Sequence, residues 1–194
     1  MGWRRHFMVP GCLKKAMLAA PLAVILIGAS AVGAQASTDA TWTIANSPNA
    51  TVTGGNIESV SCSASTACTA VGTDVNTAGI DVTLAERWNG ASWQRQATPN
   101  PAGDTTTSVA PALVGVSCPT ASFCVAVGNY QSGSDQSGLV EDWNGTAWTP
   151  ESSPNTSSGG RLVGVSCASS QTCTAVGEAA DEGGVPSTLI ETGD

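Results

Sequence analysis

The sequence predicts an all-β fold made of three repeats of four short strands each. A Val-Ser-Cys segment occurs three times, and an Ala-Val-Gly segment follows each copy at the same spacing. An Asn-Gly pair stands between two tryptophans in two of the copies. Repeats of this kind are typical of propeller blades and similar all-β units. No apolar stripe with helical spacing is found after residue 37.

Residues 1–36 are predicted to be an export signal. Basic residues precede a long apolar run, and Ala34-Gln35-Ala36 forms the small-x-small pattern of a signal peptidase site. Cleavage before Ser37 is favoured over an uncleaved membrane anchor, while Arg4-Arg5 leaves the Sec and Tat routes open. Residues 37–194 are then expected to form a secreted β-repeat domain.

Removal of the leader makes the chain strongly acidic. The sequence has 7 basic and 15 acidic residues, and four of the basic residues lie in the leader, so 7 − 4 = 3 remain and the formal charge becomes 3 − 15 = −12. Such a chain has no basic patch, so neither nucleic acid nor an anionic membrane is an expected partner. The only histidine also belongs to the leader, which excludes the usual Ser-His-Asp and Cys-His machinery.

The first two strands of each repeat have a period of two residues. In the second copy, Leu113 and Val116 are expected on opposite faces of the first strand. In the second strand, Val125 and Val127 are expected opposite Ala126. Alternation of β-branched and small residues indicates strands that pack closely against a neighbouring sheet.

The third and fourth strands are predicted to form a hairpin. Asn-Gly lies between the tryptophans at 88–93 and 143–148, and this pair is the strongest short hairpin signal. Each fourth strand runs from a tryptophan to a Pro-Asn pair, and residues 42–49 have the same spacing. The order of segments therefore allows residues 42–49 to complete the last repeat, which removes an open sheet edge. The expected repeat units are 57–100, 113–155 and 162–190.

Six cysteines follow the leader, in three pairs with five residues between the members of each pair. Each pair spans the turn between the first and second strands, and an exported protein meets an oxidising compartment, so three disulfides are predicted. Metal binding is the disfavoured alternative, because zinc sites prefer two-residue spacing and histidine. No cofactor or metal is expected. The predicted pairs are Cys62 with Cys68, Cys118 with Cys124 and Cys167 with Cys173.

The Val-Ser-Cys, Cys-x-Ala-Val-Gly and Glu-Arg-Trp-Asn-Gly-x-Ser-Trp segments resemble the repeats of secreted actinobacterial proteins. Those proteins are similar to β-propellers of the sialidase and photosystem-II-assembly-factor type. The resemblance covers residues 42–190 and implies a propeller-like fold, but the motif carries no assigned activity. Sialidase Asp-boxes are absent, so sialidase activity does not carry over. Propellers usually have four to eight blades. Three repeats therefore suggest a partial propeller or half of a six-bladed ring, with a β-trefoil as the alternative.

The hairpins also contain the candidate ligand-binding residues. A carboxylate beside an indole can bind a sugar, because the carboxylate accepts hydroxyl hydrogen bonds and the ring stacks on C–H groups. The stretch 86–93 locally resembles the hairpin of six-bladed fucose-binding lectins. The favoured alternative is a packing role, since symmetric packing also requires repeated residues. The candidates are Glu86, Trp88, Trp93, Glu141, Trp143 and Trp148, with Glu191 in the third copy.

Two departures weaken a multi-site lectin: Asp142 stands where the first copy has Arg87, and the third copy lacks the first tryptophan. Acids in the loops between the second and third strands could bind calcium, although solvated loop charge is favoured. These acids are Asp74, Asp81, Asp135, Asp181 and Glu182.

The sequence thus predicts a secreted, disulfide-linked, propeller-like binding or interaction module without catalytic activity. No residue is singled out as catalytic. One alternative is a carbohydrate-binding lectin that uses the glutamate and tryptophan hairpins. Another is a glycan-active enzyme with paired carboxylates. The expected partners are a second copy that completes a six-bladed ring, a glycan, or a cell-surface protein.

Overall fold

The computed structural model describes residues 41–48, 54–101, 111–133, 135–154, 159–181 and 183–193. The predicted leader and its cleavage site lie outside these residues. The chain divides into Met1–Trp42 and Thr43–Asp194, and the strands of the described residues all belong to the second unit. The described part is all-β, as predicted, and contains no helix that could cross a membrane.

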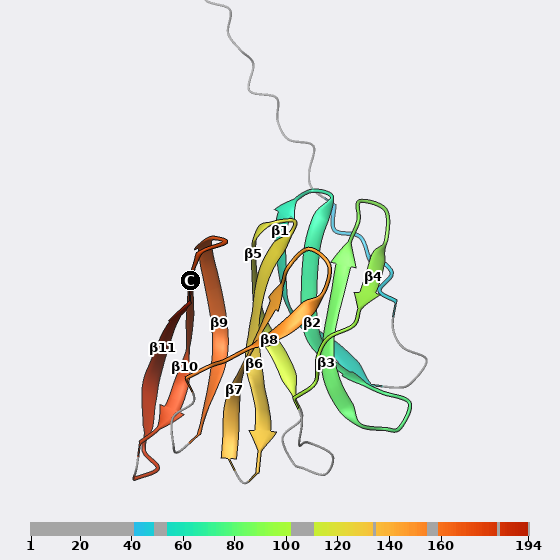
Figure 1. The fold of residues 1–194 in the computed structure, drawn as a ribbon. Helices are drawn as coiled ribbons and strands as arrows, with labels where there is room; N and C mark the ends of the chain where they lie inside the picture. The colour runs from blue at the N-terminus through green and yellow to red at the C-terminus, as the bar shows by residue number, and fades with distance from the viewer. Residues whose placement is uncertain are drawn as a thin grey trace, which may run out of the picture. The chain divides into compact units, whose positions relative to one another are not determined.

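The strands form three antiparallel sheets, and each sheet corresponds to one sequence repeat (Figure 1). The first sheet has the order β1 (Gly55–Ala64), β2 (Ala67–Val75), β3 (Asp81–Trp88) and β4 (Trp93–Gln96). The second has the order β5 (Ala112–Thr120), β6 (Phe123–Ser132), β7 (Asp135–Trp143) and β8 (Trp148–Glu151). The third has the order β9 (Gly160–Ser169), β10 (Thr172–Ala180) and β11 (Pro186–Gly193).

The third sheet differs from the other two because β11 forms its outer edge. Among the described residues, no fourth strand pairs with β11. The three sheets remain separate, and in the described part none closes into a barrel. This arrangement therefore gives no support to the β-trefoil alternative.

Each first strand has a β-bulge opposite the glycine of its Ala-Val-Gly segment. In the second sheet, the register shifts between Leu113 and Gly115, opposite Gly128. A Cβ atom at Gly128 would lie only 1.8 Å from the carbonyl oxygen of Ala112, which no side chain can tolerate. The first and third sheets have the same bulge opposite their own glycines. This close approach explains why glycine recurs at the position.

The bulge makes the predicted alternation of the first strand wrong at Leu113. Leu113 and Val116 were expected on opposite faces, but both are buried in one core cluster. The extra residue of the bulge changes which face the following side chains meet. The alternation of the second strand is confirmed, because Ala126 belongs to that cluster whereas Val125 and Val127 belong to another.

Two hydrophobic cores lie between consecutive sheets. In the first core, Val71 and Ala85 of the first sheet cluster with residues of the second sheet. In the second core, Val125 and Val127 cluster with Leu162 of the third sheet. Strand β5 contacts both β1 and β9, so the second sheet has a neighbour on each side.

The same hydrogen bond joins the first strands of consecutive sheets. The N–H of Cys118 donates to Ser61 Oγ at 3.0 Å, and the N–H of Cys167 donates to Ser117 Oγ at 2.9 Å. Ser61 and Ser117 occupy the same repeat position, as do the two cysteines. The second and third sheets are therefore joined in the same way as the first and second.

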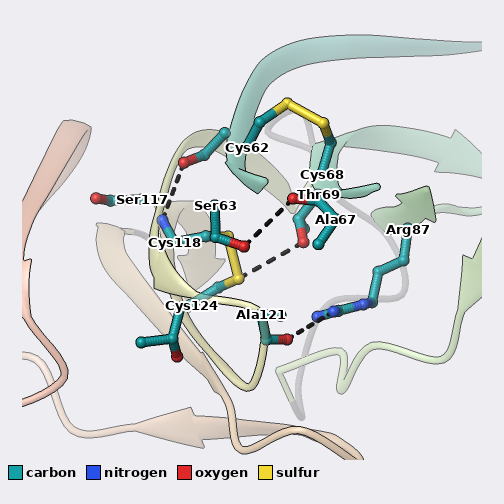
Figure 2. The surroundings of a disulfide bond; sticks show 12 residues. Cys62, Ser63, Ala67, Cys68, Thr69, Arg87, Ser117, Cys118, Ala121 and Cys124 are labelled. Atoms are coloured by element: carbon teal, nitrogen blue, oxygen red, sulfur yellow. Dashed lines mark hydrogen bonds between the residues drawn. A yellow bond between two sulfur atoms is a disulfide. The ribbon is translucent and has the colours of Figure 1, made fainter. Parts of the chain in front are cut away.

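Each predicted cysteine pair is joined in a disulfide: Cys62–Cys68, Cys118–Cys124 and Cys167–Cys173. The members of each pair lie on adjacent strands around the turn. The second disulfide is buried, and Cys124 Sγ lies 3.5 Å from Thr69 Oγ1 of the first sheet (Figure 2). This disulfide therefore also takes part in the packing between two sheets.

The predicted Asn-Gly hairpins are confirmed. In the first hairpin, the N–H of Asn89 donates to the carbonyl oxygen of Ser92, and Gly90 has a φ of 94°. The equivalent bond joins Asn144 to Ala147 in the second sheet. Each turn brings its two flanking tryptophans opposite each other in the strand register.

Candidate functional site

The repeated glutamate is buried in the first two sheets, with 2% exposure for Glu86 and 0% for Glu141. The Ser47 hydroxyl donates to both carboxylate oxygens of Glu86, at 2.8 and 2.9 Å. The Ser153 hydroxyl makes the same pair of bonds to Glu191, both at 3.0 Å. Ser47 and Ser153 occupy one repeat position, so the two contacts are equivalent.

These bonds connect neighbouring repeats. Ser153 follows β8 of the second sheet, and its partner Glu191 lies in β11 of the third. The glutamate therefore ties its own sheet to the segment that follows the fourth strand of the preceding sheet. Ser47 makes this contact with the first sheet, for which the described part contains no preceding sheet.

Glu141 lacks the equivalent bond. Thr98 has the repeat position of Ser47, but its hydroxyl donates to the carbonyl oxygen of Thr83 at 2.9 Å. The two oxygens of Glu141 are buried without a hydrogen-bond partner. Burial raises the pKa of Glu141 to about 8, while the Thr83 side chain has a smaller, opposing effect. Glu141 is therefore mostly neutral at pH 7.

The candidate tryptophans form two pairs within the hairpins. The ring centroids of Trp88 and Trp93 lie 5.9 Å apart, and those of Trp143 and Trp148 lie 5.7 Å apart. Trp88 and Trp93 are half-buried, whereas Trp143 and Trp148 belong to the core between the first two sheets. The structure thus places the second pair in packing rather than on an open surface.

Arg87 fills the space beside this second pair. Its guanidinium carbon lies 4.6 Å from the centroid of a Trp143 ring, and Nη2 donates to the carbonyl oxygen of Ala121 at 2.7 Å (Figure 2). Burial lowers the pKa of Arg87 without removing its charge. An arginine and an indole pair therefore occupy the outer part of the first gap between sheets.

The second gap, between the second and third sheets, contains a cavity of about 310 Å³, which we call the cleft. Asp142 takes the repeat position of Arg87, and Gly193 takes that of Trp143, so both large side chains are missing here. The apolar lining comes from Phe123, Val125, Val127 and Val140 of the second sheet and from Val165, Cys173 and Ala175 of the third. The acidic lining consists of Asp142, Glu151 and Glu191.

Asp142 gives the cleft an unsatisfied polar group. Its Oδ1 atom is buried and has no hydrogen-bond partner among the described residues. Burial, and to a smaller extent the nearby Glu151 carboxylate, raise the pKa of Asp142 to about 6. A donor that enters the cleft can therefore satisfy an acceptor that is costly to leave alone.

The acids predicted in loops have other roles. Asp74 lies within β2, because the pairing of β2 with both neighbouring strands continues through this residue. Its carboxylate forms an ion pair with Arg95. Asp81 and Asp135 are the first residues of β3 and β7. Asp181 Oδ1 accepts N–H bonds within its own turn, and Glu182 lies outside the described residues.

Within the described ranges, no three His, Cys, Asp or Glu side chains gather as metal ligands would. Comparison of the chain with protein families, with curated proteins and with solved structures finds no match.

Sequence reasoning did not identify the cleft as a site. Its two causes are visible in the sequence as departures from the repeat, namely Asp142 in place of Arg87 and the missing tryptophan of the third copy. Whether these departures open a cavity depends on which gap each position faces, and that is decided by how the sheets pack.

Proposed function

We propose that the chain is a secreted, non-enzymatic interaction module whose three sheets are blades of a partial β-propeller. In this proposal, the module binds an extended polypeptide segment along the edge of β11, and an aromatic side chain of that segment enters the cleft. The three disulfides support an oxidising, extracellular location.

The repeated contacts between sheets support the propeller assignment. The Ser–Cys hydrogen bond recurs with a displacement of one repeat, and the Ser–Glu hydrogen bonds of the first sheet recur in the third. In each sheet the strands follow chain order outward from a first strand that contacts the first strand of the neighbouring sheet. Successive four-stranded blades of a propeller have these features.

The observation that carries the binding proposal is that the open edge of β11 borders the cleft. Glu191, Thr192 and Gly193 of β11 line the cavity. An open edge presents unpaired backbone donors and acceptors to an incoming strand, and an adjacent apolar pocket selects one of its side chains. The volume of about 310 Å³ falls at the lower end of ligand-binding pockets.

The burial of Glu86 and Glu141 supports a packing role for the repeated glutamate and weakens the lectin alternative. One observation favours the enzyme alternative instead: Asp142 and Glu151 share the cleft, and Asp142 has the raised pKa of a general acid. That alternative requires hydrolysis of a glycan and loss of the activity in Asp142→Asn.

An array of extended peptides with one Trp, Tyr, Phe or Leu at the centre tests the proposal, with a glycan array in parallel. Asp142→Trp should fill the cleft, because the same repeat position holds Arg87 in the first gap. Asp142→Ala is the matched control that removes the carboxylate and keeps the cleft open.

At chain concentrations low enough to leave the cleft free, we expect wild type and Asp142→Ala to capture peptides with a central aromatic residue, and Asp142→Trp to lose this capture. Cleft-dependent binding of glycans without peptide capture would support the lectin instead. Release of reducing ends from a bound glycan would support the enzyme. Peptide capture that is the same in Asp142→Trp and wild type would overturn the proposed site.

A further inference from the structure

We infer that the segment bound at the cleft is residues 41–48 of a second copy of the chain. Two chains would then complete each other head to tail, with 2 × 3 sheets in a two-fold ring. This inference rests on the proposed function, because it names the partner of the same site.

The Ser47–Glu86 contact places Ser47 where a preceding sheet would end. Ser153 makes the equivalent contact with Glu191, and there the preceding sheet is the second sheet, with β8 as its fourth strand. By this equivalence, residues 42–45 have the place of a fourth strand in a sheet that precedes the first sheet. The third sheet of a second copy can be that sheet, since β11 has no fourth strand beside it in the described part.

The sequence of this segment suits the edge and the cleft. Trp88 pairs with Trp93 in the first sheet, and the same register would place Trp42 opposite Gly193 of the second copy. Trp42 and Ile44 alternate along the segment and so would share one strand face. They are 98% and 100% exposed in the single chain. The face that they share would be the one turned toward the cleft, as Trp148 faces the first sheet.

Trp42 would supply what the second gap lacks. In the first gap, the space between the sheets holds the Trp143 and Trp148 rings. In the second gap, Gly193 replaces the first of these rings, and no fourth strand of the described residues supplies the other. An indole from the second copy would fill the apolar lining, and its N–H could donate to the unpartnered Oδ1 of Asp142.

The exposed faces of the third and first sheets correspond to the two faces that pack together where consecutive sheets meet, and the chain forms that interface twice. Val127 and Val140 of the second sheet pack with Leu162 of the third. The equivalent residues on the third sheet, Val176 and Ile190, are exposed. On the first sheet, Ile57 has the repeat position of Leu162 and is also exposed. The third sheet of one copy can therefore pack on the first sheet of another as consecutive sheets do within the chain.

The hydrogen bond between first strands can be repeated too. Ser166 has the position of Ser61 and Ser117, and its hydroxyl makes no hydrogen bond among the described residues. In the assembly it would accept from the N–H of Cys62 in the second copy.

A second copy fits better than closure within one chain. Ser47 is bound to Glu86 of the first sheet, whereas β11 belongs to the third sheet. The second sheet contacts both of these sheets through β5, and the hydrophobic residues of their open faces remain exposed. One chain thus presents both complementary surfaces at once, and two such chains can satisfy both in a closed pair.

Light scattering on the full chain, exported with its own leader and purified from the exported fraction, tests the inference. We expect wild type to have twice the mass of one chain. Trp42→Ala removes the anchor, and Thr43→Ala alters the opposite face of the same segment as a control. Asp142→Trp blocks the cleft, and Gln94→Trp, which adds an indole at an exposed position of β4 outside the cleft, is its control. Trp42→Ala and Asp142→Trp should weaken the dimer about 30-fold or more per junction, and the controls should remain dimeric.

Mixing the two weakened variants provides a second readout. A pair of Trp42→Ala and Asp142→Trp chains has one junction with both an intact anchor and an open cleft, so mixing should restore dimers that neither variant forms alone. Circular dichroism melting of each variant separates loss of the junction from loss of folding. A synthetic peptide of residues 41–48 should bind Trp42→Ala, and the same peptide with alanine in place of tryptophan should not.

The outcomes distinguish this inference from the proposed function. A wild-type monomer that still captures aromatic peptides through the cleft would overturn the second copy as partner and leave the module intact. A dimer that neither Trp42→Ala nor Asp142→Trp weakens would also overturn the inference. A wild-type monomer that captures no peptide would overturn both proposals.

Discussion

At the scale of single residues, the repeat position held by Arg87, Asp142 and Thr192 controls the space between sheets. In the first gap, the long Arg87 side chain reaches Ala121 and stacks on Trp143. In the second gap, the short Asp142 side chain leaves the cleft open. One position therefore closes one gap and opens the next, although the backbone of the two hairpins is the same.

Arg87→Ala should lower the free energy of unfolding by about 2 kcal/mol, because it removes a charge-assisted hydrogen bond and a cation–π contact. Arg161→Ala is the control. Arg161 is exposed and pairs with an exposed Glu178, so its loss should cost less than about 0.5 kcal/mol. Urea denaturation measures both values. Equal losses in the two variants would contradict a packing role for Arg87.

Glu141→Gln should stabilise the protein increasingly as the pH rises. Burial raises the folded-state pKa of Glu141 to about 8 from the ordinary glutamate value of 4.5. Between these values, the unfolded state loses the proton while the folded state keeps it, so the wild type loses stability as the pH increases. The glutamine variant lacks this proton, and its advantage should grow from about pH 5 and level off above pH 8.

The melting temperature of both proteins as a function of pH measures this difference. Glu58→Gln, which changes an exposed carboxylate, is the matched control for the loss of one charge. A constant difference between Glu141→Gln and wild type across the pH range would contradict a buried, neutral Glu141.

At the scale of the strand pair, the Ala-Val-Gly segment is explained by the bulge opposite its glycine. Gly128→Ala should lower the free energy of unfolding by about 3 kcal/mol or more, because its Cβ would collide with backbone atoms of Ala112. Gly164→Ala is the control, since its Cβ would meet only Val176 at an ordinary 3.6 Å. Denaturation of the two variants tests this reason, and similar stability of both would contradict it.

The disulfides also join pairs of strands. Because their loops have equal length, a difference between their contributions to stability reports the effect of burial. Each loop closes over six residues of sequence separation, so the entropic contribution should be about 2 kcal/mol for each. Replacing Cys118 and Cys124 by alanine should cost more than replacing Cys62 and Cys68, because the second pair is buried and contacts Thr69. Equal costs by urea denaturation would show that packing around the sulfur atoms contributes nothing.

At the scale of the whole molecule, the charge balance opposes compactness. All 15 acidic residues follow residue 37, against Arg87, Arg95 and Arg161 as the only positive side chains there. Self-repulsion of this kind destabilises the folded chain and is screened by salt.

The melting temperature should therefore rise by a few degrees between about 20 and about 300 mM NaCl. Glu58→Lys, which changes one exposed acid to a base, should show a smaller rise. Differential scanning calorimetry measures both. A melting temperature that falls with salt would mean that the ion pairs Arg95–Asp74 and Arg161–Glu178 outweigh the general repulsion.

The sequence by itself determined the all-β class, the four strands of a repeat, the Asn-Gly hairpins and the disulfide pairs. These features are local, because each depends on residues that lie within one repeat and on the period of its side chains. The predicted alternation of the first strand was wrong at Leu113 because a bulge depends on the partner strand across the turn. Asp74 was placed in a loop for a similar reason, since its strand continues only as long as both neighbours pair with it.

Only the tertiary structure decided what the repeated residues do. The sequence marks Glu86, Glu141 and Glu191 as equivalent, yet two accept bonds from a serine of another segment and one is buried without a partner. It marks Asp142 and Gly193 as departures, but their effect appears only because both face the same gap. Side chains far apart in the chain share a space only after the sheets pack, so the cleft and the open edge beside it are properties of packing rather than of any one repeat.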